Sequence, residues 1–309
     1  MGITAVLSTP VYAQDFHSWL QDLRQEARQY GISEKLAREA LPDTMALNEE
    51  IIRLDRRQPE ETIGFGVYKS NVISLPRLQE GHRKIVQYRK LLKEIGTAYG
   101  VEPQYIAALW GIETSFGRNT GGFETVPALV TLAYDGRRGA FFRQELLRAL
   151  RIVDQGNIGL HEMRGSWAGA MGQCQFMPTS FEQFAQDYDK DGKRDIWNSE
   201  ADVFASTAAY LSASGWKAGQ PWGVLVGLPK NFNNNLIGPN IQKPLKFWHA
   251  AGVQLPDAFD EDEPLSIVQP GGRGYKAYAV GSNYRILLKW NYSSYFATAV
   301  GFLADRLKS

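Results

Sequence analysis

The chain has 309 residues, of which 44% are hydrophobic and 12% aromatic, and its 34 Lys plus Arg nearly balance its 33 Asp plus Glu. A formal net charge of +1 argues against a nucleic-acid partner held by counterion release. The hydrophobic content argues against global disorder, and the length fits one large or two ordinary domains. Cys174 is the one cysteine, so no internal disulfide can form.

The first residues, 1–13, are small and apolar, and Val11-Tyr12-Ala13 has the pattern of a small-residue cleavage site. We interpret 1–13 as the remnant of a secretory signal peptide, with a mature chain that begins near Gln14. An ordinary disordered N-terminus is the alternative. No cysteine lies near residue 14 to carry a lipid, and no run of about 18 apolar residues predicts a membrane span.

Hydrophobic spacing, caps and breakers predict a mostly helical α+β fold. Residues 222–283 are rich in Gly, Pro and Asn and predict short strands and loops, and 284–290 predict a further strand. Helices are expected over 15–41 (two helices), 47–55, 79–99, 103–117, 126–134, 139–153, 179–187, 200–214 and 294–307.

The helix that begins at Pro103 carries a carboxylate on its apolar face. Taking Ile106 as position i, Leu109, Trp110 and Glu113 follow at i+3, i+4 and i+7. Burial beside Trp110 and a position in the last helical turn both predict a raised pKa for Glu113, which suits a general acid near neutral pH. A core glutamate satisfied by arginine or backbone partners is the alternative.

Two loops follow with their own chemistry. Gly165 to Pro178 combines small residues, which let a ligand approach the backbone, with the polar side chains and rings that bind sugars. A tight packing loop is the alternative.

In the second loop Asp187, Asp189 and Asp191 stand at positions 1, 3 and 5 of a calcium-loop pattern and Gly192 at position 6. Position 12 is Asn198, so the closing carboxylate would come from Glu200 or Asp202; a solvated acidic turn is the alternative.

These segments occur in the same order in lytic murein transglycosylases of the B type, glycoside hydrolase family 103, which this sequence resembles over almost its whole length from about residue 15. The shared segments are Arg53 to Glu60, Glu113 to Gly117, Ala133 to Arg138, Gly165 to Pro178, the acidic loop and Trp290 to Phe296. Phe296 stands where the family can carry a tyrosine.

The resemblance implies a lysozyme-like catalytic core over 93–221, which contains Glu113 and the EF-hand-like loop. It implies a helical accessory region over 14–92 that packs with the C-terminal segment 284–309, and a small β-rich region over 222–283. It further implies a periplasmic monomer that acts on peptidoglycan glycan strands, with proteins of cell-wall synthesis or division as its partner class and no nucleic acid.

The implied reaction is cleavage of the β-1,4 bond between N-acetylmuramic acid and N-acetylglucosamine, leaving a 1,6-anhydro-N-acetylmuramic acid end. Glu113 would protonate the leaving oxygen and then take the proton of the 6-hydroxyl, while the substrate's acetamido group stabilises the oxocarbenium-like centre. No catalytic cofactor is implied.

The resemblance also assigns side chains to the substrate and to a structural Ca²⁺. The substrate-binding residues would be Tyr68, Arg137, Arg138, Ser166, Gln175, Phe176, Tyr210 and Asn291. The metal ligands would be Asp187, Asp189, Asp191, Lys193 through its carbonyl, and Asp202. For the Arg137–Arg138 pair, a surface salt bridge is the alternative.

Two other functions stay open at this point. A hydrolytic muramidase would need a second carboxylate, such as Glu124, Asp135 or Glu162, about 6.5–9.5 Å from Glu113 if it inverts. A non-catalytic peptidoglycan-binding protein would need neither Glu113 as an acid nor a second carboxylate. The mass of the product separates the two enzymes, because an anhydro product is lighter by one water.

Overall fold

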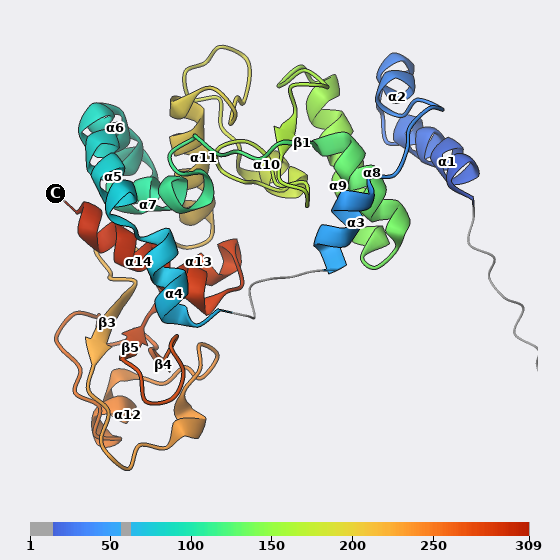
Figure 1. Cartoon of the computed structure of the whole chain (residues 1–309). Helices are drawn as coiled ribbons and strands as arrows, with labels where there is room; N and C mark the ends of the chain where they lie inside the picture. The colour runs from blue at the N-terminus through green and yellow to red at the C-terminus, as the bar shows by residue number, and fades with distance from the viewer. Residues whose placement is uncertain (1–14, 57–62, 309) are drawn as a thin grey trace, which may run out of the picture.

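The computed structural model describes residues 15–56 and 63–308, which fold as helices, loops and two small antiparallel sheets (Figure 1). The helices are α1 (Phe16–Gln29), α2 (Glu34–Ala40), α3 (Glu49–Arg56), α4 (Phe65–Val72), α5 (Leu75–Gln87), α6 (Arg89–Tyr99), α7 (Pro103–Thr114), α8 (Thr125–Asp135), α9 (Gly139–Asp154), α10 (Pro178–Phe184), α11 (Glu200–Ala213), the 3-10 helix η2 (Asn234–Leu236), α12 (Leu245–Ala250), α13 (Ser282–Trp290) and α14 (Ser294–Leu307). The expected α+β, mostly helical class is confirmed.

Two expectations fall partly or wholly outside the described residues. These are the signal-peptide remnant at 1–13 and the end of the family-like segment at 57–60. Within the described part of the chain, none of the helices combines the length and the apolar character that a membrane span requires.

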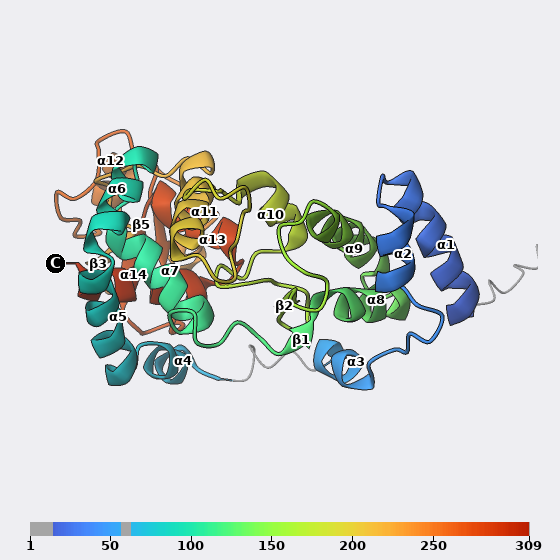
Figure 2. The same cartoon turned by 90° about the horizontal axis from the view of Figure 1, so that it is seen from above.

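Helix α7 forms the centre of the core. Pro103 occupies its first turn, where a missing N–H costs no hydrogen bond, and Ser115 ends it in the left-handed conformation at φ 51°. Residues 105–111 are all buried, and α5, α6, α11 and α14 pack around the helix (Figure 2). Gly111 permits one of these contacts, because an added Cβ would lie 2.6 Å from Cζ of Phe116. The mostly apolar sequence of α7 therefore matches a helix covered on nearly every side.

The helices before α7 divide into two groups. Helices α1 to α3 lie at one end of the molecule, where α2 packs on α9 and α3 on α8, and Arg143 of α9 pairs with Glu26 of α1 at 2.5 Å. Helices α4 to α6 lie at the other end, against α7, α11 and α14 (Figure 1). The described helices within 14–92 therefore lie in two groups, whereas one accessory region was expected. Among the described helices of this range, α4 and α5 make the main contacts with α14, which covers most of the C-terminal segment.

Three local expectations differ from the structure. Residues 284–290 belong to helix α13 instead of a strand, because Tyr284, Leu287 and Leu288 bury one helical stripe against the core. The expected helix 79–99 breaks at Tyr88 into α5 and α6. Helix α4 has no counterpart among the expected helices, since none of its residues is buried and no one-sided apolar pattern marks it.

The two sheets are short. Strands β1 (Phe123–Glu124) and β2 (Arg164–Gly165) pair antiparallel beside the glycine-rich loop. Strands β3 (Gly223–Val226), β4 (Ser266–Val268) and β5 (Ala277–Val280) form an antiparallel sheet in the order β3-β5-β4. Trp248 of α12 and Ile267 of β4 belong to a second, smaller hydrophobic cluster drawn from this region. The short strands expected within 222–283 are therefore present, together with α12.

Gly301 of α14 gives a test of this packing. A Cβ added there would overlap the indole of Trp222, which is 1% exposed. We expect Gly301→Ala to lower the free energy of unfolding by about 1–3 kcal/mol, because a core ring must move. Gly66 of α4 is the matched control, since nothing lies within 4 Å of its added Cβ, and Gly66→Ala should be neutral or stabilising by up to about 1 kcal/mol. Urea unfolding measures both, and equal effects would contradict the close contact.

Candidate active site

Glu113 lies in the last turn of α7, and its Oε1 accepts a hydrogen bond of 2.7 Å from the indole Nε1 of Trp290. Trp290 is the last residue of α13, 177 positions further along the chain. Leu109 and Trp110 of the same helix are buried, whereas Glu113 is partly exposed. The carboxylate therefore lies at the edge of the core, in a residue that remains partly exposed.

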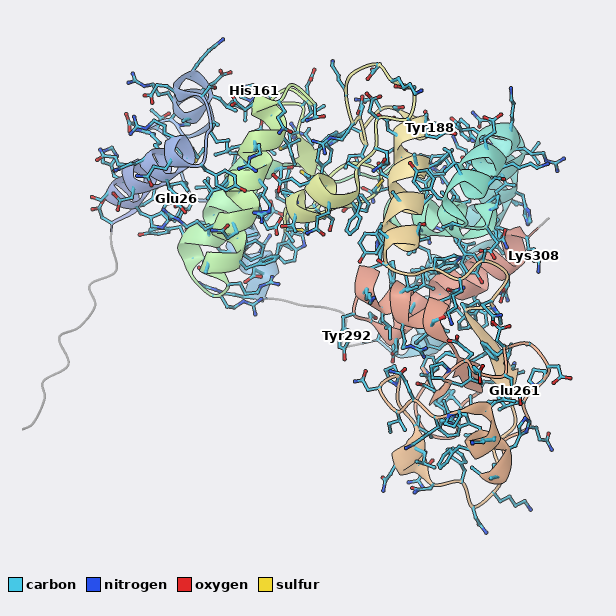
Figure 3. The ribbon with its side chains drawn as sticks, turned by 180° about the vertical axis from the view of Figure 1, so that it is seen from behind. Glu26, His161, Tyr188, Glu261, Tyr292 and Lys308 are labelled. Carbon is cyan, nitrogen blue, oxygen red and sulfur yellow. The ribbon has the colours of Figure 1, made fainter. Side chains whose placement is uncertain are left out.

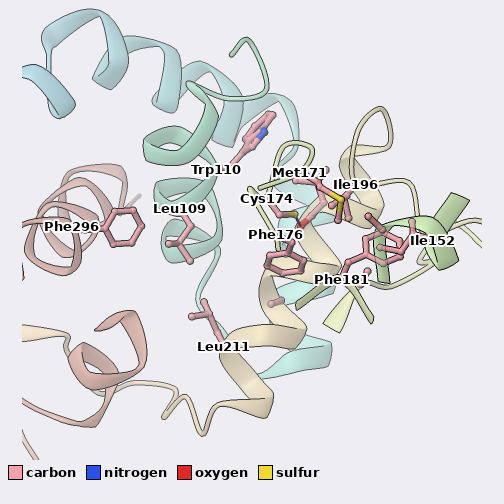
Figure 4. Packing of buried hydrophobic residues seen from close by; sticks show 14 of the residues in the cluster. Leu109, Trp110, Ile152, Met171, Cys174, Phe176, Phe181, Ile196, Leu211 and Phe296 are labelled. Carbon is pink, nitrogen blue, oxygen red and sulfur yellow. Dashed lines mark hydrogen bonds between the residues drawn. The ribbon is translucent and has the colours of Figure 1, made fainter. Parts of the chain in front are cut away.

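Aromatic rings from two other segments hold Trp290. The ring centroid of Tyr210 on α11 lies 4.7 Å from that of Trp290, and the ring of Phe176 lies 5.3 Å away. Phe176 is 3% exposed and packs in the main core between α7 and α11 (Figure 4). It has no free face on which a sugar could stack, so this arrangement does not support its expected substrate role. Its ring supports the indole instead. Tyr210 is partly exposed, and burial raises the pKa of its phenol.

The polar side chains of the loop from Gly165 to Pro178 are hydrogen-bonded to backbone groups of the loop and of Thr120. The Ser166 hydroxyl oxygen accepts from the amides of Ala168 and Ala170, at 3.3 and 3.1 Å. Gln175 donates through Nε2 to the carbonyls of Thr120 and Gly172, at 3.0 and 2.9 Å. The loop is therefore both a packed structure and a rigid support for two of the expected substrate-binding side chains.

Gln173 fastens this loop to α7. Its side-chain Oε1 accepts from Trp110 Nε1 at 2.7 Å, and its Nε2 donates to the carbonyl of Trp197 at 2.9 Å. Gln173 is buried, and the same Oε1 lies where a Cβ on Gly117 would have to go. Glycine is therefore required after Phe116, which matches the Phe116-Gly117 pair of the shared segment.

Backbone strain concentrates at this site. Among the described residues other than glycine, four have positive φ, and three of these are Ser115 (φ 51°), Phe116 (φ 60°) and Gln175 (φ 51°). Left-handed conformations of such residues persist only where the surroundings impose them, and they cluster at functional sites. The strain falls two and three residues after Glu113, at Ser115 and Phe116, and at Gln175 within the glycine-rich loop.

Tyr68 and Asn291 come to this region from α4 and from the end of α13. The ring of Tyr68 lies 5.6 Å from that of Tyr295, which the sequence did not single out. Asn291 follows Trp290 directly and is the C-cap residue of α13. Tyr292 is 81% exposed and projects from the inner side of the arch formed by the two ends of the molecule (Figure 3). The shared segment Trp290 to Phe296 therefore supplies both a partner of Glu113 and neighbouring surface groups.

Arg137 and Arg138 bind a carboxylate of this chain. Arg137 donates to Asp55 Oδ2 through Nε at 2.6 Å and to Oδ1 through Nη2 at 2.9 Å, and Arg138 donates to Oδ1 at 3.1 Å. Asp55 is 1% exposed, and hydrogen bonds from Arg137 hold the pKa of its carboxyl below the usual range. Arg137 and Arg138 therefore form a salt bridge with Asp55, as the alternative interpretation of the arginine pair expected. This salt bridge joins α3 to the turn between α8 and α9.

The carboxylates considered as a second catalytic group each have a partner elsewhere. Asp135 accepts from Arg56 at 2.9 Å, and Glu124 lies 3.3 Å from His161 Nδ1. Glu162 accepts from the amide of Gly159 at 3.3 Å. None of these contacts involves Glu113.

The acidic loop brings three of its expected ligands together. Carboxylate oxygens of Asp187, Asp189 and Asp202 lie within 4.8 Å of one another. Asp191 is not among them; its amide donates to Asp187 and Asp189, at 3.1 and 3.3 Å, and its Oδ1 accepts from the amide of Lys193. The expected ligand role of the Asp191 side chain is therefore not supported by this arrangement.

Asp202 gives the cluster a buried carboxylate. It is fully buried, and its two oxygens accept from the amides of Tyr188 and Asp195, both at 2.7 Å. Burial raises the pKa of Asp202, and the nearby charges of Asp189 and Asp187 add to this. Three carboxylates with a buried member match the oxygen donors that a hard cation such as Ca²⁺ prefers, so the residues fit the ion.

A family model for the transglycosylase SLT domain matches residues 15–305. The chain belongs to this family. It is 27% identical over 295 residues to the membrane-bound lytic murein transglycosylase B of Escherichia coli K12, covering 91% of this chain and 80% of that protein. The crystal structure of SltB3 from Pseudomonas aeruginosa in complex with NAG-anhNAM-pentapeptide matches with a TM-score of 0.91 at 41% identity, covering 96% of this chain and 80% of that one.

A structure of Escherichia coli Slt35 in complex with calcium also matches, with a TM-score of 0.82 at 28% identity and coverage of 93% of this chain and 92% of that one. The expected resemblance to B-type lytic transglycosylases with a lysozyme-like core is thereby confirmed. This SLT-domain protein is an enzyme of the lytic murein transglycosylase class, which acts on peptidoglycan.

The sequence alone does not reveal Trp290 as a partner of Glu113. Trp290 lies within a shared segment, but no local spacing shows which helix end its indole reaches. The role of Asp55 is hidden in the same way, since its arginine partners follow 82 and 83 positions later. A charged residue on the apolar side of α3 is the one signal that points to a buried pair there.

Asp55 gives a pH-dependent test. We expect Asp55→Asn to lower the free energy of unfolding at pH 7 by about 1–2 kcal/mol, since two hydrogen-bonded charges lose their partner while both guanidiniums stay half exposed to water. The folded pKa is depressed, so this stabilisation is complete above the unfolded value of about 3.9 and is lost as the pH falls through the folded pKa. The stability difference between the two proteins should therefore shrink below about pH 4.

Asp43 supplies the control, because its side chain is 66% exposed in its pair with Arg24. Asp43→Asn should cost less than about 1 kcal/mol at pH 7. Thermal unfolding across pH measures both variants. A loss at Asp55 that stays constant down to pH 2 would show that the ion pairs do not stabilise the fold.

Proposed function

We propose that this enzyme cleaves the β-1,4 bond between N-acetylmuramic acid and N-acetylglucosamine with formation of a 1,6-anhydro end, and that Glu113 is its catalytic residue. The observation that carries the assignment is the position of Glu113, at the edge of the core with its Oε1 bonded to Trp290 at 2.7 Å. Family membership and the match to SltB3 with an anhydro-sugar peptide support the reaction class. Since peptidoglycan lies outside the cytoplasmic membrane, the proposal places the reaction in the periplasm.

In the first step Glu113 gives its proton to the glycosidic oxygen, and the bond from that oxygen to the anomeric carbon breaks. The substrate's acetamido carbonyl stabilises the positive charge, so no second protein carboxylate takes part. In the second step the Glu113 carboxylate takes the proton of the 6-hydroxyl, whose oxygen bonds to the anomeric carbon. Water must lose this competition, so the bound glycan and the surrounding side chains have to exclude it.

We assign substrate contacts to Ser166 and Gln175, which the loop holds rigidly, and to Tyr68, Tyr210 and Asn291 around Glu113. Ser166 uses its oxygen as an acceptor for two amides, so its own proton is the group offered to a sugar oxygen. The side chains of Arg137 and Arg138 are 48% and 44% exposed beside Asp55. Their remaining N–H groups are the ones that would meet carboxylates of the peptide arm.

Glu113→Gln tests the catalytic assignment. The amide keeps the size of the side chain but cannot donate an acid proton, so we expect peptidoglycan cleavage to fall about 10³-fold while the melting temperature stays nearly unchanged. Glu124→Gln is the matched control, because it removes a carboxylate that lies 3.3 Å from His161 Nδ1, and it should retain activity. Release of soluble fragments, identified by mass spectrometry, measures both. Full activity in Glu113→Gln would refute the assignment.

We also propose that Asp187, Asp189 and Asp202 hold a structural Ca²⁺. The ion would offset the repulsion among three carboxylates and tie the acidic loop to the start of α11, where Asp202 lies. It would take no part in the reaction. The Slt35 structure in complex with calcium supports the choice of ion.

Calcium should raise the melting temperature of chelator-treated protein, because binding to the folded state alone stabilises it by mass action. Asp189→Asn should abolish this rise while leaving the fold intact, since Asp189 is exposed. Glu261→Gln, an exposed change in the β-rich region far from the loop (Figure 3), should leave the calcium response unchanged. No thermal shift with calcium in the unaltered protein would show that the cluster is a solvated turn.

A further inference from the structure

We propose that Trp290 determines which oxygen of Glu113 carries the acid proton, an inference that rests on the proposed catalytic role of Glu113. An indole N–H can donate a hydrogen bond but has no lone pair with which to accept one. Because it lies 2.7 Å from Oε1, that oxygen must accept in both protonation states of the carboxyl group. The carbonyl oxygen of a neutral carboxyl group is a stronger acceptor than its hydroxyl oxygen, so this bond favours the form of the acid whose proton resides on Oε2.

The direction of the indole is fixed before any substrate binds. Trp290 ends α13, and the next amide, that of Asn291, still donates to the carbonyl of Leu287 at 3.1 Å. Tyr210 and Phe176 pack on the ring at 4.7 and 5.3 Å, and Phe176 is itself buried. Rotation of the indole would have to displace a core side chain. Trp290 is thus a preorganised donor, positioned by packing.

This arrangement gives each carboxyl oxygen one task through both steps. Oε2 loses its proton to the glycosidic oxygen as the bond to the anomeric carbon breaks. Oε2 then takes the 6-hydroxyl proton as the bond from that oxygen to the anomeric carbon forms, so the enzyme neither gains nor loses a proton overall. Oε1 keeps its bond to the indole throughout, and this bond strengthens while Glu113 is a carboxylate, because hydrogen bonds to charged acceptors are stronger.

Other titratable groups approach Glu113 or its neighbours from four elements. Cys174 of the glycine-rich loop interacts electrostatically with Glu113, and Tyr210 of α11 contacts Trp290. Arg77 of α5 donates to the Ser115 hydroxyl at 2.9 Å and interacts electrostatically with Tyr68 of α4. Thiols, phenols and guanidiniums ordinarily keep one charge state between pH 4 and about 7.5, and burial raises the pKa of Cys174 to about 12. Among the described groups named here, Glu113 is therefore the one that a change near neutral pH reports on.

Trp290→Phe removes the donor and keeps an aromatic ring. A carboxylate that loses an N–H donor is less stable than its neutral acid, so its pKa rises. We expect the alkaline limb of the pH profile of kcat/KM to move up by about one unit, and the maximal rate to fall about tenfold because the proton is no longer confined to one oxygen. Replacing Trp290 with benzothienylalanine, in which sulfur takes the place of the N–H in a ring of similar size, applies the same test with packing preserved.

Trp216→Phe is the matched control. Its indole donates to the carboxylate of Glu102 at 2.8 Å, so the change removes a bond of the same kind away from Glu113. In Trp216→Phe the alkaline limb of the pH profile of kcat/KM should stay at the same pH. An unmoved limb in the position-290 variants, with a rate loss alone, would show that Trp290 only packs and would overturn the inference. Retained activity in Glu113→Gln would instead overturn the proposed function, so the two failures are distinguishable.

Discussion

A carboxyl group that must be an acid in one step and a base in the next has to be held without being permanently paired with a cation. The hydrogen bond of 2.7 Å that Oε1 of Glu113 accepts comes from a neutral group, the indole N–H of Trp290. A lysine or arginine at that position would favour the anion far more strongly and would leave little acid near neutral pH. The other contacts of the site keep the Trp290 indole N–H and Oε1 of Glu113 within hydrogen-bond distance of each other.

Several parts of the chain meet that need. Helix α7 brings Glu113 to the edge of the core and ends there in a strained turn, which Arg77 supports by donating to Ser115. The loop from Gly165 to Pro178 is fastened to α7 through Gln173 and contributes Phe176 beneath the indole. Helix α11 contributes Tyr210. The acidic cluster, whose buried member Asp202 lies at the start of α11, would fix that helix when it holds a cation. The stability of the fold and the chemistry of the site therefore depend on the same contacts among α7, the glycine-rich loop and α11.

Local sequence predicts what depends on local geometry. The bounds of α7 to α11 follow closely from proline, glycine and capping residues, and the position of Glu113 in a last helical turn follows from them. The approach of Asp187 and Asp189 also follows from loop spacing. Contacts across long sequence separations are not encoded in this way: the partners of Asp55 and Glu113 lie 82 and 177 positions away. Local sequence does not show burial either. Phe176 is a residue type that often binds sugars, but here it is buried in the core. Residues 284–290 have the composition of a strand, but they form part of a helix that buries one side.

The central claim is that one carboxyl group serves both steps and that the substrate's own 6-hydroxyl, not water, attacks the anomeric carbon. Digestion of peptidoglycan in water enriched in ¹⁸O tests this most directly. If the claim holds, the newly formed muramic acid ends carry no solvent oxygen and the fragments released by the enzyme keep their natural mass. Incorporation of one ¹⁸O at each new end would show hydrolysis by an activated water and would contradict the claim.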